Sequence, residues 1–211
     1  MTAQPTPGRP EEAVVIAMTG ASGAPYGLRL LECLLQAAET VYFVISEPGR
    51  MVVNTETALR LPSRAKDIQH VLRERYPGEG ELKVFALNDW MAPVASGSNP
   101  PRAVVVAPCT SGTLAAIASG TCRSLIDRAA DVALKERRRL ILVPREMPYS
   151  TIHLENMLKL ARLGAVIMPP APGFYTQPRN VEDLVDFVVA RVLDHLDVRH
   201  DLLPRWGEPH G

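Results

Sequence analysis

Short apolar runs alternate with amphipathic stretches along almost the whole chain. Each run has four to six residues, which is too short for a buried helix and typical of a strand in a parallel sheet. The runs are Val14–Met18, Val41–Ile45, Leu82–Leu87, Ala103–Ala107, Leu140–Pro144 and Ala165–Met168. Strands that alternate with helices predict a three-layer, doubly wound α/β domain with a mostly parallel sheet.

Apolar residues recur at helical spacing between these runs. The predicted helices are Pro25–Gln36, Gly49–Leu61, an amphipathic piece within 62–81, a segment rich in Ala and Leu that starts near Leu114, Leu125–Arg139, Thr151–Leu163 and Val181–Leu196. The chain of 211 residues is expected to form one domain over residues 13–198. Residues 1–12 are rich in Pro, Thr and Gly and are expected to form a loose arm, and residues 199–211 a tail.

A glycine-rich turn, Thr19–Gly23, joins the first strand to the first helix. Such a turn directs backbone N–H groups and the positive end of a helix dipole at one point, which suits an anion such as phosphate. The glycines at 20, 23 and 27 match neither a GxGxxG motif nor a Walker lysine motif. The turn therefore favours an anion without specifying a nucleotide.

A second turn of small hydroxyl residues and glycine, Pro108–Leu114, follows the strand Ala103–Ala107. Parallel strands end at one edge of a sheet, so the two turns are expected to bracket one phosphate-bearing cofactor. Ser46 follows the second strand at that edge and is either a ligand contact or a helix cap. Arg145 and Glu146 follow the strand Leu140–Pro144 there, where a charged pair indicates a ligand site.

Charge and composition exclude several classes of protein. Lys plus Arg and Asp plus Glu number 23 each, so no overall field attracts nucleic acid or an anionic membrane, and a basic function must be local. The apolar runs are too short to span a bilayer, and the first twelve residues lack a signal-peptide core, which predicts a cytoplasmic protein. Three cysteines and five scattered histidines show no disulfide or metal-ligand spacing, so reduced thiols and no metal are expected.

Other candidate residues have two interpretations each. Trp90, in the loop 88–98, either lines an apolar pocket or plugs the edge of the core. Arg128 and Lys135 lie seven residues apart on one helix face, where solvated cations paired with Asp131 and Glu136 are the simpler interpretation. The sequence around them does not decide between these interpretations.

Five stretches together resemble the UbiX/Pad-type flavin prenyltransferases across residues 13–207. These are TGASGAPYGLRLL, NDWMAPVASGS, APCTSGTLAAIASG, ADVALKERRRLILVPREMPYSTIHLENMLKL and PAPGFYTQP. The resemblance implies a flavodoxin-like or Rossmann-like flavoprotein that joins a dimethylallyl group from dimethylallyl monophosphate to reduced FMN. It also implies that prenylated FMN passes to a UbiD-type decarboxylase and that the protein is a homo-oligomer, dodecameric in the family.

The resemblance assigns site residues position by position. It places FMN on Gly20, Ala21, Ser22, Ser46, Thr110, Ser111, Gly112, Thr113 and Arg145. It places the prenyl phosphate and its chain near Trp90, Ser96, Arg128, Lys135, Tyr175 and Arg191, with Trp206 in a tail that packs on a site or a neighbouring subunit. Glu146, Lys135 and Ser22 are the expected catalytic residues. Thr110-Ser111 stands where relatives often have Ser-Thr, which puts fine geometry in doubt.

The implied chemistry accounts for these residue types. Breaking an allylic C–O bond leaves extra negative charge on phosphate and cation character on the prenyl group, so fixed cations and dry, electron-rich walls are needed. Bond formation at flavin N5 and ring closure at C6 release a proton, for which phosphate and Glu146 are candidate carriers. Two alternatives remain open: a protein like phosphopantothenoylcysteine decarboxylase, whose histidine and Asn-rich segment are not found here, and a passive flavin carrier. The choice between dimethylallyl monophosphate and diphosphate is also open.

Overall fold

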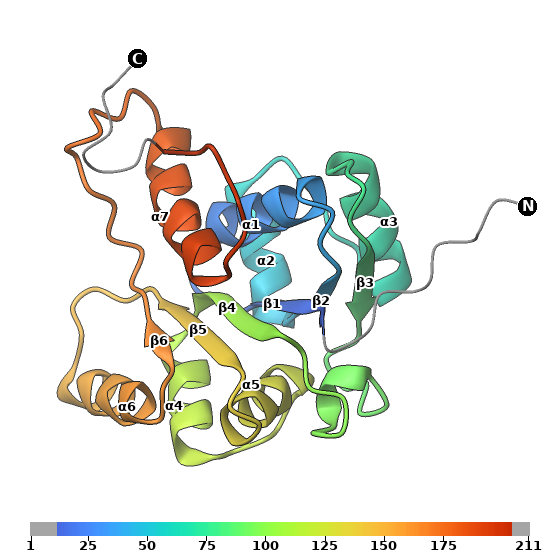
Figure 1. Ribbon diagram of the computed structural model, residues 1–211, viewed down its shortest axis with the longest axis vertical. Helices are drawn as coiled ribbons and strands as arrows, with labels where there is room; N and C mark the ends of the chain where they lie inside the picture. Colours follow the sequence, from blue (N-terminus) through green and yellow to red (C-terminus); the bar gives the residue numbers. More distant parts are fainter. Residues whose placement is uncertain (1–11, 204–211) are drawn as a thin grey trace, which may run out of the picture.

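A computed structural model describes residues 12–203, and these residues form one six-stranded sheet (Figure 1). Every strand pairing in it is parallel. In chain order the strands are β1 (Val14–Met18), β2 (Val41–Ile45), β3 (Leu82–Phe85), β4 (Ala103–Cys109), β5 (Arg139–Pro144) and β6 (Val166–Ile167). Most of the predicted arm at 1–12 and Trp206 in the predicted tail lie outside the described residues.

The spatial strand order is β3-β2-β1-β4-β5-β6. This is the order of the Rossmann fold, in which the chain turns to opposite sides on leaving β1 and β4. Val14 of β1 pairs with Val41 on one side and with Ala103 on the other, so β2, β1 and β4 begin level with one another. The doubly wound α/β prediction is confirmed, and the fold places the expected ligand crevice at the carboxyl ends of β1 and β4.

Helices cover both faces of the sheet and form two cores (Figure 1). One face carries α1 (Ala24–Gln36), α2 (Glu47–Glu56), α3 (Ala65–Arg75) and α7 (Val181–His195), and the other carries α4 (Ser111–Ser119), α5 (Leu125–Lys135) and α6 (Thr151–Arg162). Alternate residues of β1 supply both cores: Ile16 joins the first and Val15 the second. Because all of β1 is buried, the strand reads as one continuous apolar run.

Two helices, α2 and α5, end four or five residues before their predicted ends. α2 begins at Glu47 with Ser46 as its cap and ends at Glu56, instead of spanning Gly49–Leu61. α5 ends at Lys135 because Arg137 takes a left-handed backbone conformation with a φ of 55°, which turns the chain out of the helix. Arg139 is therefore the first residue of β5 rather than the last of a helix.

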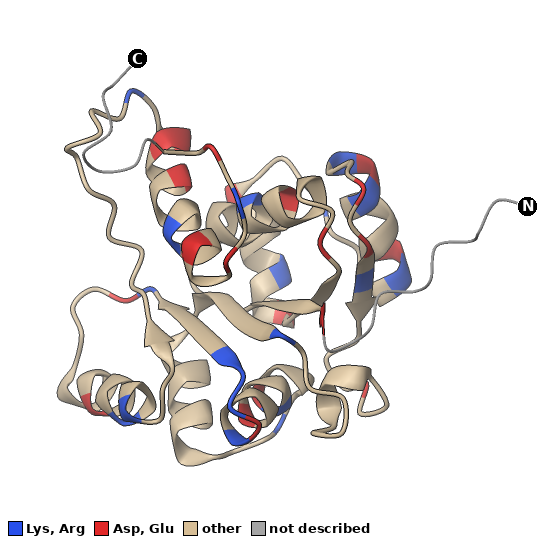
Figure 2. Cartoon of the chain, in the orientation of Figure 1, with Lys and Arg blue, Asp and Glu red and all other residues tan. Residues whose placement is uncertain are grey.

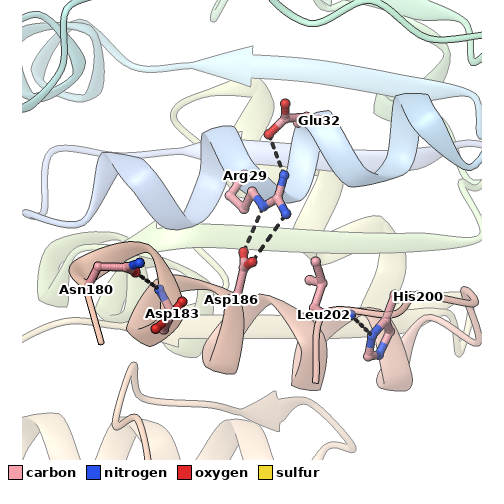
Figure 3. A network of polar contacts seen from close by, with 7 residues as sticks. All are labelled: Arg29, Glu32, Asn180, Asp183, Asp186, His200 and Leu202. Atoms are coloured by element: carbon pink, nitrogen blue, oxygen red, sulfur yellow. Dashed lines mark hydrogen bonds and ion pairs between the residues drawn. The ribbon is translucent and has the colours of Figure 1, made fainter. Parts of the chain in front are cut away.

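A polar network joins α7 to α1 (Figure 3). Arg29 Nε and Nη2 donate to Asp186 Oδ1 and Oδ2 at 2.7 and 3.2 Å, and Nη1 donates to Glu32 Oε2 at 2.7 Å. The Asp186 carboxylate is the main reason that the pKa of Arg29 is raised above its ordinary value. Asn180 caps the start of α7 by accepting a hydrogen bond from Asp183 N at 2.8 Å. The last helix is thus held in place by a two-point guanidinium–carboxylate contact.

The three cysteines differ in accessibility, which predicts their reactivity. Burial raises the pKa of Cys33 to about 11 and that of Cys109 to about 12, whereas Cys122 is exposed. Because the thiolate is the reactive form, we expect iodoacetamide at pH 7.5 to modify Cys122 alone in the folded protein and all three after denaturation. Peptide mass spectrometry measures this. Rapid modification of Cys109 in the folded protein would contradict the burial of its side chain.

Candidate active site

Thr19 joins the two turns at the carboxyl edge of the sheet, where the strands end. Its side chain is 4 % exposed. Thr19 Oγ1 donates to Pro108 O at 2.8 Å and accepts from Thr110 N at 2.8 Å. The backbone N–H of Thr19 also donates to Pro108 O, at 3.2 Å. One buried hydroxyl therefore fixes the separation of the turns that follow β1 and β4.

The second turn ends in the N-terminus of α4. Thr110 caps this helix: its Oγ1 accepts from Thr113 N at 3.0 Å and donates to Thr113 Oγ1 at 2.9 Å. Ser111 and Gly112 are the first helical residues, and helix geometry gives their N–H groups no internal acceptor. A Cβ on Gly112 would contact only Thr110 Oγ1, at 3.9 Å, so the approach to these N–H groups is open. The start of α4 is suited to a phosphate.

The start of α1 is different, because a carboxylate of the chain itself is bound there. Glu56 Oε2 accepts from Gly23 N and from Ala24 N, both at 2.9 Å. Gly23 has a φ of 118°, a conformation that favours glycine, and offers no side-chain cap to α1. The expectation that the first N–H groups of α1 are free for an anion is therefore wrong for Gly23 and Ala24, since Glu56 already satisfies both.

Glu56 is a functional candidate that the sequence reasoning missed. Burial acts to raise the pKa of its carboxyl, but hydrogen bonds from Ser22, Gly23 and Ala24 and the charge of Arg145 outweigh it, and the pKa is lowered overall. Glu56 therefore bonds to Ser22, one of the predicted catalytic residues, and is sensitive to the charge of Arg145. Its position inside the predicted helix Gly49–Leu61 gave no local signal of this role, since the partners lie more than thirty residues away.

The hydrogen bonds to Glu56 predict a pH-dependent stability. A carboxyl whose pKa is lower in the folded state stabilises the fold above its ordinary pKa, and this contribution disappears as the pH falls through the folded value. At pH 7 we expect Glu56→Gln to lower the free energy of unfolding by about 0.5–1 kcal/mol, a modest effect because solvent screens this exposed group. Urea unfolding at several pH values measures the difference between wild type and variant. A difference that persists at pH 2.5 would contradict the assignment.

The other predicted cofactor residues gather at the same edge. Ser46 N donates to Met18 O at 3.0 Å, and Ser46 Oγ accepts from Gly49 N at 3.1 Å, so Ser46 caps α2. Arg145 N donates to Cys109 O at 3.2 Å, which places Arg145 beside the second turn. The fold thus brings together the turn residues Gly20, Ala21 and Ser22, the cap Ser46, the α4 residues Thr110, Ser111, Gly112 and Thr113, and the charged pair Arg145 and Glu146.

A second group of predicted residues lies on α5 and on the loop 88–98. Arg128 Nε donates to Ala95 O at 2.9 Å and its Nη1 pairs with Asp131 at 2.7 Å. Lys135 pairs with Glu136, and a Cβ on Gly97 would overlap Lys135 Nζ. Both cations therefore have the local acidic partners that the solvated-face interpretation expected.

The loop side chains of this second group are accessible. Trp90 is 49 % exposed and belongs to neither core, which argues against its role as a plug of the core edge. Ser96 Oγ lies 2.8 Å from Ser98 Oγ. Trp90 and Ser96 are thus available on the surface of the loop for contacts with another molecule.

Lys135 lies far from Glu146 in a single chain. α5 begins beside the carboxyl edge, where Leu125 N donates to Leu87 O at 2.8 Å, and it ends just before β5 begins at the opposite, amino edge. Eleven helical residues span about 16 Å, so Lys135 lies towards the amino edge while Glu146 follows the carboxyl end of β5. One chain does not bring these two predicted catalytic residues together.

A third group lies around α7. The Tyr175 and Phe187 rings are 5.7 Å apart at an edge-to-face angle of 76°, and Tyr175 is 60 % exposed. Arg191 Nη1 pairs with Asp194 Oδ2 at 2.5 Å, and Asp194 Oδ1 also lies 3.2 Å from His200 Nε2. The predicted residues thus fall into three groups, at the carboxyl edge of the sheet, on α5 with the loop 88–98, and around α7.

Residues 12–203 contain neither a candidate metal site nor a candidate membrane-spanning helix. No three His, Cys, Asp or Glu side chains in this range are grouped so that they could hold a metal ion. In the same range, no helix combines the length and the apolar character needed to cross a membrane.

Comparison with known proteins identifies first the class and then the family. The family model named Flavoprotein matches residues 3–193. The flavin prenyltransferase UbiX of Pseudomonas aeruginosa is 61 % identical over 201 residues, covering 94 % of this chain and 96 % of that protein. The chain belongs to the flavoproteins and, within them, to the UbiX flavin prenyltransferase family.

Solved structures agree with this membership. AnUbiX (PadA1), in complex with FMN and dimethylallyl pyrophosphate, has a TM-score of 0.83 and is 41 % identical, covering 95 % of this chain and all (100 %) of that one. A dodecameric FMN-dependent UbiX-like decarboxylase from Escherichia coli O157:H7 has a TM-score of 0.81 and is 40 % identical, covering 93 % and 100 % of the two chains. The resemblance on which the prediction of family rested is confirmed.

Proposed function

We propose that this protein joins the dimethylallyl group of dimethylallyl monophosphate to N5 and C6 of reduced FMN and so forms prenylated FMN. The single observation that carries this proposal is the pair of turns cross-linked by Thr19 at the switch point of the sheet. The named activity of the UbiX relatives supports it, as does the AnUbiX structure with FMN and dimethylallyl pyrophosphate.

The residues at the carboxyl edge fit FMN. The open N-terminus of α4, with the hydroxyls of Thr110 and Thr113, is the natural place for the FMN phosphate, because the start of α1 is already neutralised by Glu56. The glycine turn at Gly20–Ser22 then faces the flavin ring, and Arg145 adds a positive charge. Bound FMN supplies the nucleophilic nitrogen and carbon of the reaction.

The chain's own residues supply charge, a dry wall and a proton carrier. Arg128, Lys135 and Arg191 are the cations proposed to stabilise charge on the departing phosphate. The exposed indole of Trp90 offers an electron-rich face to a prenyl group with cation character. Glu146 is proposed to move the proton that leaves at ring closure.

We also propose that each active site is completed by neighbouring subunits. Lys135 lies towards the amino edge of its own chain and Glu146 at the carboxyl edge, and the E. coli relative is dodecameric. Large apolar side chains are also exposed on the chain: Met147 is 89 %, Phe174 72 % and Tyr175 60 % exposed. Large exposed apolar side chains are typical of protein contacts, so these residues support a homo-oligomer with shared sites.

A complementation experiment tests the shared site. Lys135→Gln and Glu146→Gln proteins, each inactive alone, are unfolded together and refolded as mixed oligomers. If the two residues of one site come from different chains, random mixing restores intact sites and about a quarter of the wild-type activity. Activity that stays at the level of the unmixed variants would contradict the shared site while leaving the reaction itself untouched.

The reaction is tested directly by mass spectrometry. Anaerobic incubation of the protein with reduced FMN and dimethylallyl monophosphate is expected to give a flavin enlarged by one C5 unit. The diphosphate in a parallel reaction decides which donor is preferred. An unchanged flavin in both reactions would favour the passive carrier instead. The product is expected to activate a UbiD-type decarboxylase, and a cytoplasmic location is the prediction that accompanies this role.

A further inference from the structure

Four arginines line a pocket at the amino edge of the sheet, where the strands begin. The pocket has a volume of about 390 Å³ and is lined by Arg102, Arg137, Arg138 and Arg139 together with Asp197. In Figure 2, the blue of Lys and Arg marks the beginnings of β4 and β5 and the loop that leads into β5. This edge is opposite to the turns that are proposed to hold FMN.

The chain path brings these arginines together. Arg137 leaves α5 with a left-handed φ of 55°, and Arg138 N donates to Ala133 O at 2.8 Å, which closes the helix end. Arg139 of β5 pairs in register with Ala103 of β4, and neighbouring strands lie about 4.8 Å apart. Arg138 and Arg102, which come just before these two residues, therefore enter the sheet side by side. The local run of arginines and the distant Arg102 therefore meet only because β4 and β5 are adjacent.

Two of the arginines are fixed by acidic partners. Arg102 Nη2 donates to Glu39 Oε2 at 2.9 Å, and Arg139 Nη1 donates to Asp197 Oδ2 at 2.8 Å and to His195 O. The hydrogen bond from Arg139 lowers the pKa of Asp197, and the charges of Arg139 and Arg102 act in the same direction. Arg102 and Arg139 are thus held in place around the pocket.

The other two arginines leave positive charge that the described protein does not neutralise. Arg137 and Arg138 are exposed, and their side chains have no hydrogen bond or ion pair within residues 12–203. Arg102 Nε is buried and has no hydrogen-bond partner in that range. Its buried position keeps this donor away from a ligand in the pocket, so the charge available to a ligand comes from Arg137 and Arg138.

We propose that this pocket binds a small anion that carries two or more phosphate groups. Guanidinium groups present planar N–H forks that match phosphate oxygens, and Arg137 and Arg138 add two positive charges, unpaired within the described residues, beside the ion-paired Arg102 and Arg139. The volume lies in the range of small-molecule sites. The ligand class is that of inorganic diphosphate or the phosphate chain of a nucleotide, held at the edge of the sheet away from the flavin.

Calorimetric titration of the FMN-loaded protein with inorganic diphosphate at 150 mM NaCl tests this site. We expect saturable binding of one diphosphate per chain. The double variant R137Q/R138Q is expected to raise the Kd at least tenfold. Because Arg137 has a strained backbone, R137G/R138Q provides a second variant that removes the same charges while favouring the native turn. A parallel titration with ATP shows whether a nucleotide's phosphate chain binds more tightly than free diphosphate.

Matched variants separate this site from other cations. R64Q/R162Q removes two exposed arginines on α3 and α6 and should leave the Kd within about twofold. Lys135→Gln reports on the proposed substrate site, because Lys135 does not line the pocket. Loss of binding in Lys135→Gln but not in R137Q/R138Q would place the diphosphate at the substrate site and overturn the proposal. The proposal would also be overturned if R64Q/R162Q raised the Kd as much as R137Q/R138Q does, or if the wild type gave no saturable heat.

Discussion

Glu146→Gln is expected to lower the rate of flavin prenylation about 100-fold while leaving FMN affinity within about twofold, because a general acid or base contributes factors of this size to a rate and not to cofactor binding. Glutamine keeps the length and hydrogen-bonding shape of glutamate but cannot carry the proton released at ring closure. Glu146 follows β5 beside Arg145, at the edge where the cofactor residues gather. Single-turnover absorbance and the mass of the flavin product measure the rate.

Glu155→Gln is the matched control for this change. Glu155 is an exposed glutamate on α6 and is not among the predicted site residues. Its replacement by glutamine should therefore leave the rate of flavin prenylation unchanged. An accumulating flavin that carries the C5 unit at N5 but lacks the second ring in Glu146→Gln would support the proton role directly. A wild-type rate in this variant would remove Glu146 from the mechanism.

Thr19→Val is expected to lower the free energy of unfolding by about 2 kcal/mol, because it leaves the Thr110 N–H without its acceptor and removes one of the two hydrogen bonds that Pro108 O accepts. Valine has nearly the shape of threonine, so the core around the site stays filled. The two hydrogen bonds that are lost, to Pro108 O and from Thr110 N, hold the second turn against the first. FMN affinity should therefore fall about tenfold as well, since α4 is no longer fixed relative to Gly20–Ser22.

Thr19→Ser separates the hydroxyl from the methyl group. It keeps both hydrogen bonds and should retain most of the FMN affinity, at a small cost in packing. Thr55→Val is the surface control, because Thr55 Oγ1 bonds only to Met51 O on exposed α2. Thermal unfolding and flavin fluorescence titration measure the two effects. If Thr19→Val binds FMN as tightly as Thr19→Ser, the cross-link is not what positions the cofactor site.

The strands were predictable because their signal is local. Val14–Met18 and Val41–Ile45 occur in the structure at the predicted bounds, since a strand buried on both faces must be apolar throughout. The end of α5 was not predictable from the same kind of signal. Glu136 and the following arginines favour a helix locally, but the chain has to reach the start of β5, and Arg137 takes a left-handed conformation to do so.

The candidate site also has features that the sequence predicted and features that it did not. The turns at Thr19–Gly23 and Pro108–Leu114 could be predicted as one site because parallel strands end at one edge. Thr19 as their cross-link and Glu56 as the acceptor at α1 could not, because their partners are about ninety and more than thirty residues distant. Lys135 was expected beside Glu146, yet α5 carries it towards the opposite edge of its own chain.

The sequence by itself determined the doubly wound class, the placing of the two turns at one edge of the sheet and, through its motifs, the family, since these rest on short periodicities and on residues close together in the chain. Only the tertiary structure decided which N–H groups remain for a phosphate, because the Glu56 carboxylate reaches α1 from a different helix. It likewise decided that Arg102 meets the arginines before β5. Charges and hydrogen bonds act over a few ångströms in space, and the strand order sets which distant residues come within that distance.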